Sequence, residues 1–180
     1  PDGKEATAVE SSKKIDAGKK ETIIQNADVK KPALWDVDHP QLYKAITTLI
    51  VKKQNLDEVT TDFGIRDAHF EAATGFWLNG KNIKIKGACL HHDGGAFGAA
   101  VPLSVWEKRL ASLKEIGVNG IRTSHDEVAP EFLDLCDKLG FVVLDETFDT
   151  WYAAKPGGEK GYNLYFTDWW ERDTRDIVLR

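Results

Sequence analysis

The chain has 180 residues, of which 42% are hydrophobic and 29% are charged, a composition that indicates a folded globular protein and excludes disordered, collagen-like and low-complexity classes. Acidic residues outnumber basic ones by 29 to 24, giving a formal charge of -5, so we expect no nucleic-acid partner, because phosphate backbones attract basic surfaces. The longest apolar runs, such as Phe141–Leu144, are far shorter than the roughly 20 residues that cross a bilayer, so we expect no membrane span.

The first third of the chain has the residue pattern of a β-sheet protein. Its first 20 residues are polar and lysine-rich, which is typical of exposed strands and turns or of partial disorder. Glu21–Ile24 and Leu42–Val51 are β-branched and partly alternating, and the breaker pairs Lys31-Pro32 and His39-Pro40 separate them. These patterns predict short strands of a β-sandwich.

A hairpin and a helix follow. Asn79-Gly80 stands between two extended runs, which is the strongest short-range indication of a two-residue β-turn. Further on, Ser104 and Glu107 have the spacing of a helix capping box, and apolar residues recur on one helical face until Gly117. We therefore expect a helix that starts at Ser104 and stops before this glycine.

The last part of the chain alternates strands and helices. Val118–Thr123 and Phe141–Leu144 are predicted strands, and between them a helix opens at Pro130 and closes at Gly140. A last helix is expected from Asp168 or the residue before it. The continuous apolar run of the second strand and the repeated strand-helix order predict a parallel sheet in an α/β fold.

Polar residues follow each predicted strand of this sheet. In open α/β sheets and barrels, ligands bind at the carboxyl ends of the strands. Charged groups, hydrogen-bonding groups and aromatic rings together are what a polyhydroxylated sugar requires for orientation. The residues at these ends are His91-His92-Asp93, then Arg122-Thr123-Ser124-His125, then Asp145-Glu146 with Phe148 and Trp151.

Other interpretations of these residues remain open at this point. His91, His92 and Asp93 are types that bind metals, although adjacent side chains on a strand point to opposite faces and do not easily share one ion. Arg122 and Glu146 could form a purely structural ion pair. Cys89 and Cys136 lie in apolar stretches and are expected to behave as small hydrophobes.

Three segments of the second half resemble the opening of the catalytic barrel of glycoside hydrolase family 2, which includes β-galactosidases, β-glucuronidases and β-mannosidases. Upstream, two further segments are similar to the last strands of the immunoglobulin-like sandwich that precedes that barrel. The resemblance implies an α/β fold with a partial (β/α)8 TIM barrel over 71–180, its first three βα units, after the C-terminal strands of an immunoglobulin-like β-sandwich over 1–70. The segments are Ile85–Asp93, Leu113–His125 and Phe132–Glu146 for the barrel, and Pro32–Tyr43 and Asp62–Arg66 for the sandwich.

The resemblance also implies roles for individual residues. Arg122 matches an arginine that orients the nucleophilic glutamate, and His125 matches a histidine that contacts the sugar. His91 and Asp93 match positions that contact sugar hydroxyls, and Glu146 matches a carboxylate at the end of the third strand. The substrate-binding set expected from the resemblance is therefore His91, Asp93, Arg122, His125 and Glu146, with Trp151 as an aromatic wall.

The expected activity is retaining hydrolysis of terminal β-glycosidic bonds, with a β-linked sugar as the partner and no cofactor or metal. The run resembles the β-galactosidase branch best, and β-glucuronidase and β-mannosidase are the alternatives. In the family, the acid/base follows an Asn in an Asn-Glu pair on a later strand and the nucleophile lies further on; no Asn-Glu dipeptide occurs here. We therefore expect a fragment of a longer protein, without either catalytic glutamate, that is inactive alone and whose parent could be an oligomer.

Two other classes of function are alternatives to a glycosidase. The chain could be a non-catalytic module that binds sugar or serves as a scaffold, although the lack of methionine disfavours a stand-alone gene product. A metal-dependent barrel hydrolase would need ligands on other strands as well.

Overall fold

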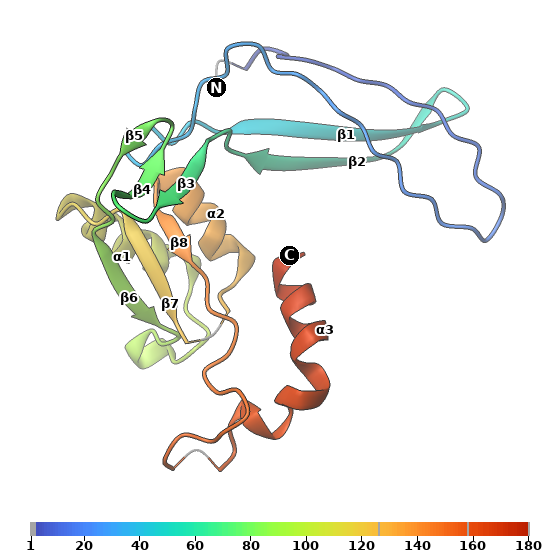
Figure 1. The fold of residues 1–180 in the computed structure, drawn as a ribbon. Coiled ribbons are helices and arrows are strands. Elements are labelled where there is room, and N and C mark those ends of the chain that lie inside the picture. Colours follow the sequence, from blue (N-terminus) through green and yellow to red (C-terminus); the bar gives the residue numbers. More distant parts are fainter. Residues whose placement is uncertain (1–2, 126, 158, 180) are drawn as a thin grey trace.

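The computed structural model describes residues 3–125, 127–157 and 159–179. The strands in these ranges form three sheets, ordered β1-β2, β3-β4-β5 and β6-β7-β8 (Figure 1). None of the helices in the same ranges is both long and apolar enough to cross a membrane. The strands are β1 Tyr43–Val51, β2 Gln54–Phe63, β3 Ala68–Glu71, β4 Gly75–Leu78, β5 Lys81–Asn82, β6 Gly87–His91, β7 Gly120–Ser124 and β8 Val142–Leu144; the helices are α1 Leu103–Glu115, α2 Pro130–Leu139 and α3 Phe166–Val178, with 3-10 turns η1 Gly95–Phe97 and η2 Tyr162–Leu164.

The β1-β2 pair is a long antiparallel hairpin that projects away from the parallel sheet (Figure 1). Its turn residues Lys52 and Lys53 both have positive φ, as a tight hairpin turn requires. The strand predicted over Glu21–Ile24 is wrong, because this stretch is exposed coil. β-branched residues favour extended backbone, but a strand is held by hydrogen bonds to a neighbour, and no strand among the described residues pairs with this stretch.

The hairpin predicted at Asn79-Gly80 is confirmed. Asn79 has φ 52° and Gly80 has φ 74°, and Leu78 pairs with Lys81 across the turn. The two positive φ values are those of a type I′ turn, which asparagine and glycine tolerate best. Leu78 is 2% exposed and anchors this small sheet in a buried cluster with Trp35.

The predicted parallel sheet is confirmed by the pairings of β6 with β7 and of β7 with β8. Helix α1 connects the first pair and α2 the second. The predicted capping box at Ser104 is wrong, since α1 starts at Leu103 after Pro102 and the N-cap position makes no side-chain hydrogen bond. Ser104 is thus already inside the first helical turn, where its hydroxyl no longer caps. The ends of α2 are as predicted, with Pro130 first and Gly140 in the left-handed conformation after the last turn.

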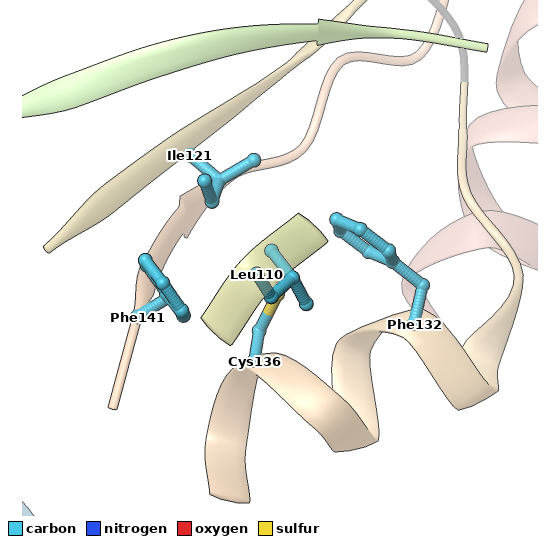
Figure 2. Close-up of a cluster of buried hydrophobic side chains, with 5 residues drawn as sticks. All are labelled: Leu110, Ile121, Phe132, Cys136 and Phe141. Carbon is cyan, nitrogen blue, oxygen red and sulfur yellow. The ribbon is translucent and has the colours of Figure 1, made fainter. Parts of the chain in front are cut away.

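The main core lies between the parallel sheet and its two helices (Figure 2). Leu110 comes from α1, Ile121 from β7, Phe132 and Cys136 from α2, and Phe141 from the residue before β8; each is at most 2% exposed. Such side chains contribute about 1.5–3 kcal/mol each through burial. This cluster fixes the sheet edge at which the strand-end residues lie.

A second contact joins the segment before β1 to the end of α2, and we call it the Trp35 seam. The Trp35 indole Nε1 donates a hydrogen bond to the Asp137 carbonyl at 2.8 Å. Nζ of Lys114 donates to the carbonyls of Val37 at 2.5 Å and Gly140 at 2.8 Å. Partial burial lowers the pKa of Lys114 through desolvation of the ammonium group. The seam therefore holds two distant parts of the chain together by partly buried polar contacts.

Helix α3 packs on the segment that leads to it, and Figure 1 shows it standing apart from α1 and α2. The Phe148 ring stacks on Tyr162 at 4.5 Å between centroids and meets Phe166 edge-on at 5.5 Å. The helix starts at Phe166, within two residues of the predicted start. Aromatic contacts rather than the main core therefore hold this helix.

Candidate functional site

The two faces of the parallel sheet carry different residues. Alternate side chains along a strand point to opposite faces, so on β7 Ile121 enters the core under the helices while Arg122 projects from the other face. Cys89 of β6 stands beside Arg122 in the register, and His91 stands beside Ser124. Polar side chains from neighbouring strands therefore meet on the face away from the helices, at the carboxyl ends of the strands.

An ion pair between Arg122 and Glu146 forms the centre of this cluster. Arg122 Nε lies 2.6 Å from Glu146 Oε1, and the two side chains are 38% and 24% exposed. Nη1 of Arg122 also donates to Ser124 Oγ at 3.1 Å and contacts the Cys89 sulfur at 3.5 Å. The hydrogen bond to Cys89, followed by that to Glu146, raises the pKa of Arg122. The guanidinium group is thus a permanent cation held in one orientation by several acceptors.

His125 lies between charged groups on both sides. Its Nδ1 is 3.4 Å from Nη2 of Arg122 and 3.4 Å from Oε2 of Glu146. Its Nε2 is 3.9 Å from Oδ1 of Asp149, and the ring meets the His91 ring edge-on at 5.5 Å. When Nδ1 accepts from the guanidinium group, the remaining N–H is on Nε2 and faces the Asp149 carboxylate.

Asp149 extends the cluster through a second ion pair. Its Oδ1 also contacts Nζ of Lys155. The hydrogen bond from this lysine is the largest cause that lowers the pKa of Asp149, and the charge of the lysine adds to it. Both carboxylates of the cluster, Glu146 and Asp149, are therefore paired with cations.

The structure brings four of the six residues predicted from the sequence together: His91, Arg122, His125 and Glu146. Asp93 makes its contacts elsewhere, since its Oδ1 accepts the N–H of Gly95 at 2.8 Å and its carbonyl accepts from Arg109 at 2.9 Å. Trp151 is 64% exposed. Among the described residues, no hydrogen bond or ion pair joins either residue to the Arg122–Glu146 pair.

Several members of the cluster were missed by sequence reasoning. The expectation that both cysteines behave as small hydrophobes fits Cys136, which is buried, but not Cys89, which is exposed. Hydrogen bonds from Arg122 and then Ser124 lower the pKa of the Cys89 thiol, whereas burial raises that of Cys136 to about 12. The alternation of β6 could have placed Cys89 on the face of Arg122.

Asp149 and Lys155 could not be found from the pattern, because they lie on a long irregular segment after β8. Within residues 3–125, 127–157 and 159–179, no group of three or more His, Cys, Asp and Glu side chains could hold a metal ion.

A parallel sheet with helical crossovers and a charged cluster at the carboxyl ends of its strands defines an α/β protein of the class that binds ligands at that edge. Sequence comparison places the chain within this class more narrowly. A family model described as the TIM barrel domain of glycosyl hydrolases family 2 matches residues 72–169, and a second model of glycosyl hydrolases family 2 matches residues 1–66. The chain belongs to glycosyl hydrolase family 2.

Individual relatives agree with this assignment. A β-galactosidase, BoGH2A, from Bacteroides ovatus is 46% identical over 179 residues, which are 99% of the chain and 21% of the relative. A putative β-glucuronidase from Formosa agariphila is 42% identical over 153 residues, 85% of the chain and 15% of the relative. The crystal structure of a β-glycosidase from Bacteroides vulgatus superposes with a TM-score of 0.80 at 42% identity, over 84% of the chain and 20% of that structure. The chain thus spans about a fifth of the length of these relatives.

Proposed function

We propose that this chain supplies the sugar-binding edge of a retaining β-glycosidase that acts on terminal β-galactosides. The observation that carries the proposal is the Arg122–Glu146–His125 cluster, which lies at the carboxyl edge of a parallel sheet in a member of glycosyl hydrolase family 2. In the fold that we propose, residues 71–180 are the first three βα units of a (β/α)8 barrel. Residues 1–70 are the last strands of an immunoglobulin-like sandwich, and the antiparallel β1-β2 hairpin supports the sandwich character of this part.

The proposed task of the cluster is to bind and orient the sugar. Imidazole and guanidinium N–H groups can donate to sugar hydroxyls, and carboxylate oxygens can accept from them. We assign this contact to His91, His125 and Glu146, and to Arg122 the orientation of neighbouring carboxylates. Asp93 and Trp151 are assigned to the rim of the same site.

We place the two catalytic carboxyl groups of the proposed reaction, the nucleophile and the acid, outside this chain. A retaining glycosidase needs a nucleophilic carboxylate and a protonated acid roughly 5 to 5.5 Å apart. Glu146 and Asp149 are each paired with a cation, and the pKa of Asp149 is lowered. A carboxyl with a lowered pKa is a poor proton donor near neutral pH, so Asp149 does not suit the acid, and the Glu146 carboxylate is held in its ion pair with Arg122.

The charge of the cluster favours a neutral sugar. A glucuronide carries a carboxylate that requires an unpaired cation, and both cations of the cluster, Arg122 and Lys155, are already paired with acids. Two relatives named β-galactosidase also match 99% of the chain. A β-glucuronidase is the second candidate, because the relative from Formosa agariphila is nearly as similar as BoGH2A.

The test uses the protein encoded by the complete reading frame that contains these residues, with nitrophenyl β-galactoside, β-glucuronide and β-mannoside as substrates. We expect the galactoside to be cleaved fastest. Arg122→Ala should reduce kcat/KM by ~100-fold or more, because it removes an oriented charge from the site, whereas Arg175→Ala on the exposed side of α3 is the matched control. If the glucuronide is cleaved fastest, the protein is a β-glucuronidase and the proposed substrate is wrong. If the protein binds sugar but cleaves none of the substrates, it is a non-catalytic module and the proposed function is wrong.

A further inference from the structure

Thr123 is a buried polar residue on the face of β7 opposite to the cluster. It is 1% exposed. Its hydroxyl donates a hydrogen bond to Oδ1 of Asp145 at 2.9 Å and accepts one from the backbone N–H of Glu146 at 2.8 Å. Both hydrogen-bonding capacities of the hydroxyl are thus directed at the two residues that follow β8.

These contacts begin where the backbone ladder ends. The last paired residues of β7 and β8 are Arg122 and Leu144, so no strand pairing holds Asp145 or Glu146. The Thr123 hydroxyl continues the connection between the two strands by a side chain for two more residues. The Glu146 carboxylate then emerges on the opposite face, where it meets Arg122 at 2.6 Å.

We propose that Thr123 is a positioning residue, which sets the place at which the Glu146 carboxylate meets Arg122 and His125. The proposal rests on the proposed glycosidase function for its kinetic readout, and on the geometry of the cluster for its structural readout. Without the hydroxyl, the Glu146 N–H loses its acceptor and the Asp145 carboxylate loses a donor, so the segment after β8 is free to shift. Displacements of about 0.5 Å already exceed the tolerance of a preorganised site.

The experiment is a double-mutant cycle in the full-length protein, with Thr123→Val and Glu146→Gln as its two changes and nitrophenyl β-galactoside as substrate. Thr123→Val alone should lower kcat/KM by ~10- to 100-fold, the size expected for two lost hydrogen bonds and a misplaced group. In the Glu146→Gln background the same change should have less than about a twofold effect, because the residue through which Thr123 acts is already impaired. Thr123→Ser keeps the hydroxyl and should restore kcat/KM to within about threefold of the parent. This result would show that the loss in Thr123→Val comes from the hydrogen bonds and not from a change in side-chain volume.

The control is Thr150→Val, which removes another buried hydroxyl. Thr150 is 6% exposed and its Oγ1 accepts the N–H of Asn163 at 3.0 Å. This hydroxyl does not act through Glu146, so the effects of Thr150→Val and Glu146→Gln on kcat/KM should be additive. The variant thus shows the result expected for a purely structural hydroxyl. Thermal unfolding of every variant accompanies the kinetics.

Additive effects of Thr123→Val and Glu146→Gln, or failure of Thr123→Ser to restore activity, would overturn the proposal. If Thr123→Val does not fold, Thr123→Ala takes its place in the cycle, and failure of both to fold would assign the hydroxyl to the fold instead of the site. If the parent protein cleaves none of the three glycosides, the proposed function fails by itself. The positioning role is then decided by crystal structures, in which the Glu146 carboxylate of the valine variant should move from Arg122 by more than about 0.5 Å.

Discussion

Replacement of Lys114 by methionine tests whether the Trp35 seam stabilises the fold through its polar contacts. The ammonium group donates to two carbonyls, at 2.5 Å and 2.8 Å, and hydrogen bonds from a charged donor contribute about 1.5–3 kcal/mol each. Its Nζ also lies 5.0 Å from the centre of the Phe141 ring, which adds about 0.5–1 kcal/mol. Relief from burying the charge offsets part of this sum, since desolvation lowers the pKa of the group. We expect a net loss of about 2–3 kcal/mol in the free energy of unfolding.

The assay is urea unfolding of the purified chain, followed by tryptophan fluorescence. Trp35 is 1% exposed, so its emission should shift to longer wavelength when the seam loosens. Lys108→Met is the matched control, because Lys108 is an exposed lysine of the same helix. The reasoning fails if Lys114→Met and Lys108→Met change the free energy of unfolding by the same amount within about 0.5 kcal/mol.

Three further outcomes are expected. Phe132→Ala should destabilise the chain by about 3–5 kcal/mol, since it empties a 1% exposed site; a loss below about 1 kcal/mol in urea unfolding would mean that the core collapses around the gap. Iodoacetamide should alkylate Cys89 in the folded chain, because its pKa is lowered by its guanidinium neighbour, and should reach the buried Cys136 only after unfolding; peptide mass spectrometry would show the reverse order if this is wrong. Because Lys155 holds the pKa of Asp149 below 3.8, the pair stabilises the fold above that pH and this contribution is lost as the pH falls through the folded pKa. Lys155→Met should therefore flatten the decline of stability below pH 3.8 in urea titrations, and an unchanged slope would count against the ion pair.

The elements that sequence predicts best are those with strong local chemistry at both ends. Pro130 and Gly140 bound α2 because each has a backbone preference that suits only that end of a helix. The Asn79-Gly80 turn follows from positive φ in the same way. Where the local chemistry was ambiguous, the context decided: Ser104 lies inside α1 because Pro102 starts the helix earlier, and Glu21–Ile24 has no strand to pair with in the described part of the chain.

The residues of the candidate site also differ in how well the sequence predicts them. Residues that directly follow a strand, such as Arg122 and Glu146, are predictable because parallel strands bring their carboxyl ends to one edge. Cys89 was missed because an apolar neighbourhood in sequence says nothing about which face of the sheet a side chain occupies. Asp149 and Lys155 join the cluster through the course of an irregular segment, and no periodicity encodes such a path.

Strand β7 shows how one short segment serves stability and chemistry with alternate residues. Ile121 and Thr123 are 2% and 1% exposed under the helices, while Arg122 stands on the opposite face with 38% of its side chain exposed. Substitution of Ile121 should therefore lower stability by cavity formation, at about 0.5–1.5 kcal/mol for valine. Substitution of Arg122 removes a partly solvated ion pair, which contributes little to stability because solvent screens it. The charged face of the strand is thus free to suit a ligand, because the fold depends chiefly on the other one.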